Sequence, residues 1–218
     1  MTFSEAFPIW DRLTPEEQHA LESAAQKRYV KKDTVLHSGK EDCVGLFAIC
    51  SGQLRAYIVS PEGKEVTLYR LFERDMCLFS AACIMNSIQF DIMIGAEKDA
   101  ALWMIPVEVY KRLMQTSAVL ANYTNELMAS RFSEVMWRLD QILFQRFDRR
   151  LASFLLEESA IDGSDTLETT HEKIANHLGS AREVITRMLK YFQGEQMVEL
   201  SRGTIRLTDR AKLELLAQ

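Results

Sequence analysis

The sequence is poor in cysteine and in positive charge. Only four cysteines occur in 218 residues, and without secretory features they indicate cytosolic thiols rather than a disulfide framework. The 26 Lys and Arg are outnumbered by 31 Asp and Glu, which excludes a surface that attracts nucleic acid over its whole extent. From Glu168 onward, however, eight Lys and Arg stand against seven Asp and Glu. Attraction for a polyanion must therefore come from a local patch.

Long apolar runs and a leader are also missing. No run approaches the about 20 residues that a membrane-spanning helix needs. The N-terminus has no basic region followed by an apolar stretch, as a signal peptide would. We therefore expect no signal peptide, no membrane association and a cytoplasmic location.

Short apolar segments separated by turn residues fill the chain between Lys27 and Pro106. Before them, the capping residue Thr14 and the acids that follow predict a helix from about Pro15 to Ala25. Many short strands with glycine turns are typical of an antiparallel jelly roll. We place this domain at residues 1–115. The expected strands are 34–37, 44–50, 54–59, 66–71, 90–95 and 101–105.

A helical pattern returns after Pro106 and continues to about Phe144. Its apolar residues alternate by four and three positions, which is the heptad pattern of a coiled-coil seam. We predict that residues 116–146 form the dimerisation helix of a homodimer; the alternative is that the same stripe packs on the protein's own sheet. The predicted seam comprises Asn125, Met128, Phe132, Val135, Leu139 and Ile142.

Two short helices across a glycine turn are predicted near the end of the chain. The first ends at Gly179, and the second runs from Ser180 to Phe192. Both starts fit a capping arrangement, in which Thr169 pairs with Glu172 and Ser180 pairs with Glu183. The apolar edge of the first helix consists of Ile174, Ala175 and Leu178. The second helix has an apolar stripe of Ile185, Met188, Leu189 and Phe192, and an opposite face of Arg182, Glu183, Thr186, Arg187 and Lys190.

This pair of helices suggests a helix-turn-helix whose second helix enters the major groove of DNA. A helix at residues 148–158 precedes the pair, and two short strands at 197–200 and 204–207 follow as a hairpin, the wing of a winged helix. Arg202 and Arg206 on this hairpin are candidates for phosphate contacts. We place the DNA-binding domain at residues 147–218, so the expected fold is α+β.

The order of these parts resembles the Crp/Fnr family of bacterial transcription regulators. The strongest local match runs from Ile174 to Leu189. The resemblance implies that Arg182, Glu183 and Arg187 read base edges. Physical chemistry agrees, because Arg is bidentate to guanine and Glu accepts from cytosine N4. The predicted DNA-binding residues are Thr170, Ser180, Arg182, Glu183, Thr186, Arg187 and Lys190, with Thr170, Ser180 and Lys190 on phosphates.

The first domain is similar to the family's cyclic-nucleotide-binding-like jelly roll, but it departs where a ligand would bind. The turn Arg74-Asp75 lacks the Gly-Glu pair that holds the ribose, and residues 87–92 contain no arginine for the phosphate. We therefore predict an effector other than cyclic AMP. The resemblance places the effector pocket at Leu78, Phe79, Ser80, Val135 and Met136.

Cys77 and Cys83 fall near that predicted pocket, so a thiol or iron–sulfur redox sensor of the same architecture is the alternative function. Buried free cysteines are common, however, and no C-x2-C pair occurs. The lone histidines His19 and His37 are weak candidates for haem. We expect no metal and no cofactor.

Two further classes of protein remain as alternatives. A jelly-roll metal enzyme needs clustered histidines, but only four histidines occur and no H-x-H pair stands in the strand region. We therefore predict no enzymatic activity. An adaptor whose helix-turn-helix contacts other proteins is the last alternative. The expected partners are double-stranded DNA with a palindromic operator, a second copy of the chain, RNA polymerase, and an unknown small-molecule or redox effector.

Overall fold

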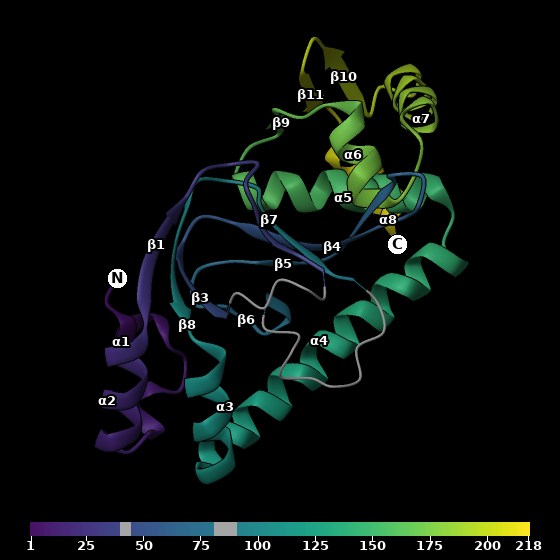
Figure 1. The fold of residues 1–218 in the computed structure, drawn as a ribbon. Helices are drawn as coiled ribbons and strands as arrows, with labels where there is room; N and C mark the ends of the chain where they lie inside the picture. Colours follow the sequence, from purple (N-terminus) through teal and green to yellow (C-terminus); the bar gives the residue numbers. More distant parts are fainter. Residues whose placement is uncertain (40–44, 81–90) are drawn as a thin grey trace. The chain divides into compact units, whose positions relative to one another are not determined.

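The computed structural model describes residues 1–39, 45–80 and 91–218 (Figure 1). The chain forms two compact units. The N-terminal unit comprises Met1–Val59 and Leu68–Val135, and the C-terminal unit comprises Ser60–Thr67 and Met136–Gln218. No helix among the described residues combines the length and the apolar character that crossing a membrane requires.

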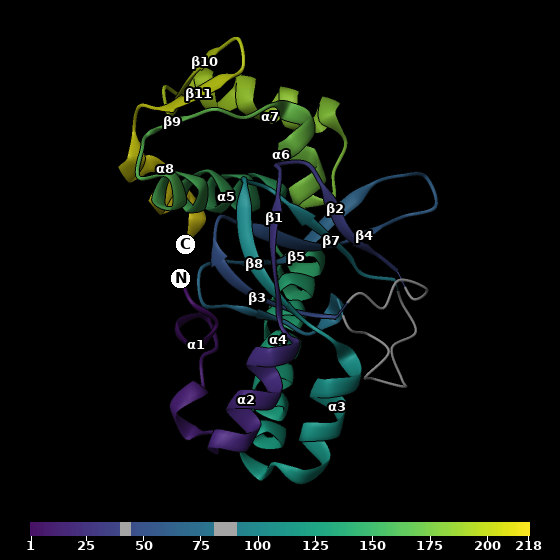
Figure 2. The same ribbon diagram turned by 60° about the vertical axis from the view of Figure 1, so that its left-hand side comes forward.

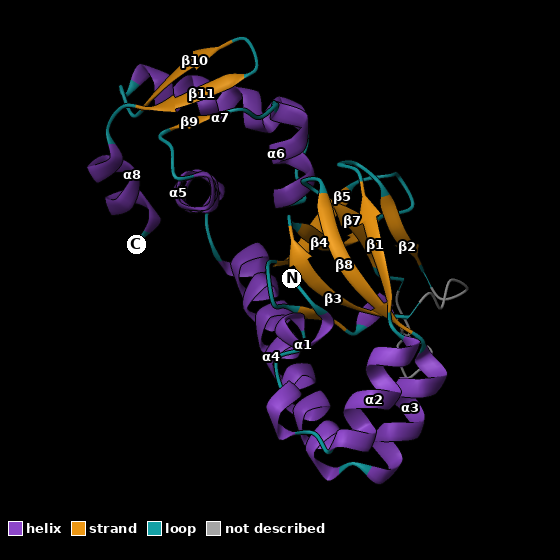
Figure 3. Ribbon diagram, turned by 90° about the vertical axis from the view of Figure 1, so that its left-hand side faces the viewer, coloured by secondary structure: helices purple, strands orange, loops and turns teal. Residues whose placement is uncertain are grey.

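The N-terminal unit contains two antiparallel sheets of four strands each. One sheet has the order β1-β8-β3-β6 and the other β2-β7-β4-β5. Figure 3 draws the strands in orange. The predicted antiparallel arrangement is confirmed; β1 and β6 were not predicted. The strands are β1 (Gln26–Val30), β2 (Val35–Ser38), β3 (Leu46–Ser51), β4 (Leu54–Val59), β5 (Glu65–Leu71), β6 (Met76–Cys77), β7 (Met93–Ala96) and β8 (Ala100–Ile105).

Strand β3 faces two hydrophobic clusters, which explains its unbroken apolar sequence. Successive side chains of a strand point to opposite faces. Leu46 and Ala48 accordingly join a cluster with the N-terminal helices, whereas Phe47 and Ile49 join the cluster made by the strands of both sheets. The N-terminal helices are α1 (Phe3–Ala6), the 3-10 helix η1 (Trp10–Arg12) and α2 (Pro15–Ala24).

Helix α2 begins as predicted, because Thr14 and Glu17 form a capping box and Pro15 occupies the first turn. Helix α3 (Val107–Thr116) and helix α4 (Ala118–Phe144) follow the strands, separated at Ser117 (Figure 2).

Helix α4 divides the predicted seam between two faces. Met128 and Val135 pack against the hydrophobic clusters of the N-terminal unit. Phe132 and Leu139 are 67% and 43% exposed. The exposed positions repeat by four and three as Asn125, Ala129, Phe132, Met136, Leu139 and Leu143.

The C-terminal unit packs its helices and a three-stranded sheet around a single hydrophobic cluster. The predicted wing is the antiparallel hairpin β10–β11, and a short strand β9, which was not predicted, extends its sheet. The elements are α5 (Phe147–Asp162), β9 (Thr166–Leu167), α6 (His171–Leu178), α7 (Arg182–Gly194), β10 (Val198–Ser201), β11 (Thr204–Leu207) and α8 (Arg210–Ala217).

Gly52, in the turn between β3 and β4, supplies a testable constraint on the N-terminal unit. It has a φ of +88°, and a Cβ there would lie 2.3 Å from the backbone oxygen of Asp99. Gly63 has a similar φ of +80° but nothing within 4 Å of its Cβ position. We expect Gly63→Ala to lower the free energy of unfolding by about 1 kcal/mol through backbone strain alone. Gly52→Ala should cost about 2–4 kcal/mol, because overpacking adds to the same strain.

Urea unfolding followed by circular dichroism measures both changes, with Gly63→Ala as the matched control. Equal losses in the two variants would contradict the role assigned to the close approach of Asp99.

Candidate nucleic-acid interface

Helix α6 is capped one residue later than the sequence pattern predicted. Thr170, and not Thr169, is the N-cap, and its hydroxyl accepts a hydrogen bond of 3.2 Å from the Lys173 amide. At the other end Gly179 adopts the left-handed conformation expected of it, with a φ of +65°. The Ser180 amide then donates back to the Ala175 carbonyl at 3.0 Å, which closes the turn.

The capping box predicted for the second helix is wrong. Helix α7 starts at Arg182 with Ala181 as its N-cap, and no side chain caps it. Glu183 therefore occupies the second helical position rather than the third, so it is out of register for a capping box with Ser180. The sequence pattern assigned Glu183 both to a helix cap and to a base contact. In this structure its side chain is not used in a cap.

The two faces predicted for α7 are present. Ile185, Leu189 and Phe192 are fully enclosed in the hydrophobic cluster of the C-terminal unit. Burying each such side chain contributes roughly 1.5–3 kcal/mol, which fixes the rotation of the helix. The opposite face forms an open depression of about 400 Å³ lined by Arg182, Glu183, Thr186, Arg187 and Lys190.

The cations of this face are uncompensated. Within the described ranges, the side chains of Arg182, Arg187 and Lys190 take part in no ion pair. Elsewhere in the same unit Arg206 pairs with Glu199, and Arg210 pairs with Asp165 and Glu214. Positive charge is thus left free on one face of α7 in a chain whose net charge is −5.

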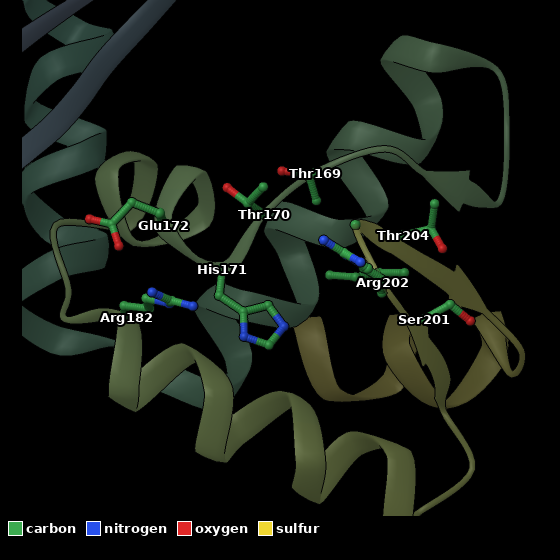
Figure 4. A pocket seen from close by; sticks show the side chains of 10 residues that line it. Thr169, Thr170, His171, Glu172, Arg182, Ser201, Arg202 and Thr204 are labelled. Carbon is green, nitrogen blue, oxygen red and sulfur yellow. The ribbon is translucent and has the colours of Figure 1, made fainter.

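A second pocket, of about 480 Å³, lies beside this face (Figure 4). We call it the wing-side pocket. Three segments of the C-terminal unit bound it: the start of α6, the first residue of α7, and the β10–β11 turn. Its lining residues are Thr169, Thr170, His171, Glu172, Arg182, Ser201, Arg202, Gly203, Thr204 and Ile205.

His171 links this pocket to α7. Its Nδ1 lies 2.8 Å from the Thr186 hydroxyl, which in turn donates to the Arg182 carbonyl at 2.9 Å. Partial burial, and then the charge of Arg182, lower the pKa of His171 below its usual value. The environment therefore favours the neutral imidazole over the charged one.

The residues predicted to line an effector pocket are distributed over both units. Leu78 and Phe79 are buried members of the two clusters of the N-terminal unit, and the buried Ser80 hydroxyl donates to the Cys77 carbonyl at 3.2 Å. Val135 is partly buried against one of these clusters. Met136 is 45% exposed and begins the second segment of the C-terminal unit.

Of the cysteine pair considered for redox chemistry, Cys77 is fully enclosed, and burial raises the pKa of its thiol. Cys83 lies outside the described residues, as does Cys43. His37 is buried on β2 and His19 is exposed on α2. Over the part of the chain that the structure describes, no three His, Cys, Asp or Glu residues are arranged to hold a metal ion.

Sequence reasoning missed a buried charged residue, Arg131, on α4. Its guanidinium contacts Asp75 at 3.3 Å and Glu134 at 2.9 Å, and it lies 4.8 Å from the centre of the Tyr69 ring. The spacing from Met128 to Val135 places Arg131 on the same inward face, which was the available sign of its burial. The Tyr69 hydroxyl has no hydrogen-bond partner among the described residues.

Comparisons with known proteins agree with this two-part organisation. A family model for the cyclic nucleotide-binding domain matches residues 26–117, and one for the Crp-like helix-turn-helix domain matches residues 149–216. A crystal structure from Eubacterium rectale, described as a regulator of the crp/fnr family, is 57% identical. It superposes with a TM-score of 0.95, over 97% of this chain and 98% of the other.

Curated relatives match over most of their length. The cyclic AMP receptor protein of Thermus thermophilus is 26% identical over 96% of both chains. The transcriptional activator protein FnrA of Stutzerimonas stutzeri is 25% identical over 94% of this chain and 86% of its own. The name of the first relative refers to cyclic AMP, and the name of the second does not.

The enclosure of Cys77 predicts an unreactive thiol. We expect iodoacetamide at neutral pH to label Cys77 in the folded protein far more slowly than an exposed thiol, because the reacting thiolate is disfavoured by burial. Peptide mass spectrometry measures the labelling of each cysteine separately, and the protein unfolded in guanidinium chloride is the control. Equally rapid labelling of Cys77 in both states would contradict the prediction.

Proposed function

Because the chain belongs to the Crp/Fnr family of transcription regulators, we propose that it is a homodimeric, sequence-specific DNA-binding regulator. The observation that carries the proposal is the outward face of α7. On this face Arg182, Arg187 and Lys190 form no ion pair with any residue that the structure describes, and the opposite face of the helix is buried in the core. A cytoplasmic location and contact with RNA polymerase belong to the same proposal, as does the division into domains at 1–115, 116–146 and 147–218.

We assign base recognition to Arg182, Glu183 and Arg187. All three are exposed, and none is used in a helix cap. An arginine presents two parallel N–H donors to the O6 and N7 of guanine, and a carboxylate accepts from the N4 of cytosine; each good pair is worth about 1–3 kcal/mol of discrimination. Of the remaining predicted contacts, Thr170, Ser180 and Lys190 suit phosphates, which position the protein without specifying sequence. The Thr186 hydroxyl donates its one proton to the Arg182 carbonyl, so it has none left for a phosphate.

The homodimer is proposed to form through the exposed stripe of α4. Phe132, Leu139 and Leu143 are 67%, 43% and 61% exposed, which is unusual for large apolar side chains that follow a heptad repeat. Asn125 lies on the same stripe as a polar position that selects the register. A two-fold pair of α7 helices would then match two half-sites about one DNA turn apart.

The effector is proposed to differ from cyclic AMP. Arg131, a buried cation of the N-terminal unit, is already compensated by Asp75 and Glu134, so it would bind an anionic ligand only after losing those partners. The sequence around Arg74-Asp75 lacks the glycine and glutamate that the family's cyclic nucleotide binders use. The buried thiol of Cys77 gives no support to thiolate chemistry at that position.

The base contacts can be tested on a duplex recovered by selection from random sequence. We expect Arg187→Ala to relax preference at one base position in each half-site, lowering affinity for the selected duplex by about 5- to 150-fold per half-site while affinity for a scrambled duplex falls much less. Lys190→Ala is the contrast. It should weaken both duplexes alike and reduce the slope of log K against log salt by about 1 per bound subunit.

Fluorescence anisotropy over a salt series measures both quantities. Unchanged sequence preference in Arg187→Ala and in Arg182→Ala would show that the assigned readout is wrong. Failure of the wild-type protein to bind any duplex, with and without cell-derived small molecules, would favour the adaptor function instead.

The proposed dimer interface on the exposed stripe of α4 can be tested by placing a charged residue on that stripe. We expect Leu139→Glu to yield monomers, because two carboxylates would face each other in a desolvated seam. Affinity for a palindromic duplex should then fall by about a hundredfold or more through loss of bivalency. Leu215→Glu is the matched control, since Leu215 is 72% exposed but lies on α8. Sedimentation velocity measures the state of association, and a Leu139→Glu dimer would contradict the assignment.

A further inference from the structure

The wing-side pocket brings cationic and hydroxyl groups from separate segments to one place. In Figure 4, Arg182 and Arg202 lie on opposite sides of His171, and Thr170 lies above it. With a volume of about 480 Å³, the pocket has room for a phosphodiester group and several waters. It opens beside the face of α7 that is proposed to enter the major groove, so it would lie close to the DNA backbone.

The two wing arginines differ in what they contact. Arg206 is paired with Glu199 on the neighbouring strand. Arg202 lines the pocket and takes part in no ion pair with any residue that the structure describes. Both are exposed and both stand on the same hairpin, so only their partners separate them. The free charge of Arg202 suits an anion in the pocket.

The hydrogen bonds of His171 determine where its proton lies. The Thr186 hydroxyl has one proton and donates it to the Arg182 carbonyl. Its oxygen must therefore accept from Nδ1–H of His171. The neutral ring consequently has a bare acceptor at Nε2, which lies toward the wing residues Ser201 and Arg202 (Figure 4). An anion there is repelled by the neutral ring, and it is bound once Nε2 takes up a proton.

The acidic residue of the pocket restricts where an anion can lie. Glu172 lies on the Arg182 side of the pocket (Figure 4), away from Arg202. Among the residues that line the pocket, Glu172 is the one with a carboxylate, so no lining carboxylate lies on the Arg202 side. The Thr170 hydroxyl accepts from the Lys173 amide, so its proton remains available for an anion as well.

We propose that the wing-side pocket binds one DNA backbone phosphate between His171 and Arg202, with Thr170 as a further donor and with uptake of one proton from solvent at Nε2 of His171. The inference rests on the proposed function and deepens it. Arg202 supplies permanent charge, whereas His171 supplies charge only when phosphate is bound. Because His171 also holds Thr186 of α7, the phosphate would position the helix that contacts the bases.

The linkage to pH has a defined sign. The groups facing His171 are Glu172 on α6, Arg182 and Thr186 on α7, and Arg202 on the wing. Arg182 and burial hold the pKa of the free imidazole below its usual value, and a phosphate beside it raises the pKa in the complex. DNA affinity should therefore rise as pH falls, by up to tenfold per pH unit and per subunit between these two pKa values.

The test compares four proteins on the selected duplex and on a scrambled duplex by fluorescence anisotropy, over salt and between about pH 5.5 and pH 8. We expect Arg202→Ala to weaken both duplexes about tenfold and to reduce the salt slope by about 1 per subunit. Arg206→Ala, the matched comparison, removes a cation that is already paired with Glu199, so it should reduce the salt slope by less than Arg202→Ala does. His171→Gln, which can still donate to Thr186 but cannot gain a proton, should lose most of the pH dependence while its salt slope at pH 8 stays unchanged.

A duplex with a neutral methylphosphonate at single positions locates the phosphate. One position per half-site should weaken the wild type more than it weakens Arg202→Ala, in which His171 and Thr170 still contact that phosphate. Equal salt slopes for Arg202→Ala and Arg206→Ala, or an unchanged pH dependence in His171→Gln, would overturn the inference while leaving the proposed function intact. Absence of DNA binding by the wild type would overturn both. Thermal unfolding of each variant shows whether a loss comes from misfolding.

Discussion

Burial of one side of α7 is the constraint on which the interface depends. Ile185, Leu189 and Phe192 are enclosed in the hydrophobic cluster of the C-terminal unit, and together they fix the helix about its own axis. Successive residues of a helix are about 100° apart. A shift by one residue toward the C-terminus would bury Thr186, Lys190 and Gln193 in their place, and burying the Lys190 charge without a partner would cost several kcal/mol. The core thus determines which side chains of α7 face outward. Arg182 and Arg187 are among them, so their charges are exposed.

This constraint explains why so much of the C-terminal unit could be predicted from sequence. Apolar residues repeat about every 3.6 positions in a helix and every two positions in a strand, because one face of each element avoids water. These repeats can be read from the sequence without knowledge of the fold. Caps depend on a single hydrogen bond. Ser180 and Glu183 have the residue types and the spacing of a capping box. Helix α7 nevertheless begins after Ala181, and neither side chain caps it. Side-chain preference alone therefore did not determine where the helix begins.

Helix α4 shows the limit of pattern on its own. Its apolar residues fit a heptad seam, but Met128 and Val135 belong to the inner face whereas Phe132 and Leu139 belong to the outer one. All four are apolar, so hydrophobicity could not separate them. In the structure Arg131 marks the inner face of α4, because it pairs with Asp75 of the N-terminal unit. Asp75 is far away in the sequence. A contact of that kind follows from the packing of helix on sheet, which no local pattern contains.

The same argument applies to charge. The sequence presents Arg202 and Arg206 as equivalent members of one hairpin, and only the cross-strand pairing of Glu199 with Arg206 makes them different. In an acidic protein, a polyanion is attracted to places where cations without ion-pair partners gather on one surface. In this chain the unpaired cations of α7 and the wing turn adjoin, joined through His171 and Thr186. Recognition of bases and of backbone would then be two parts of one hydrogen-bonded surface.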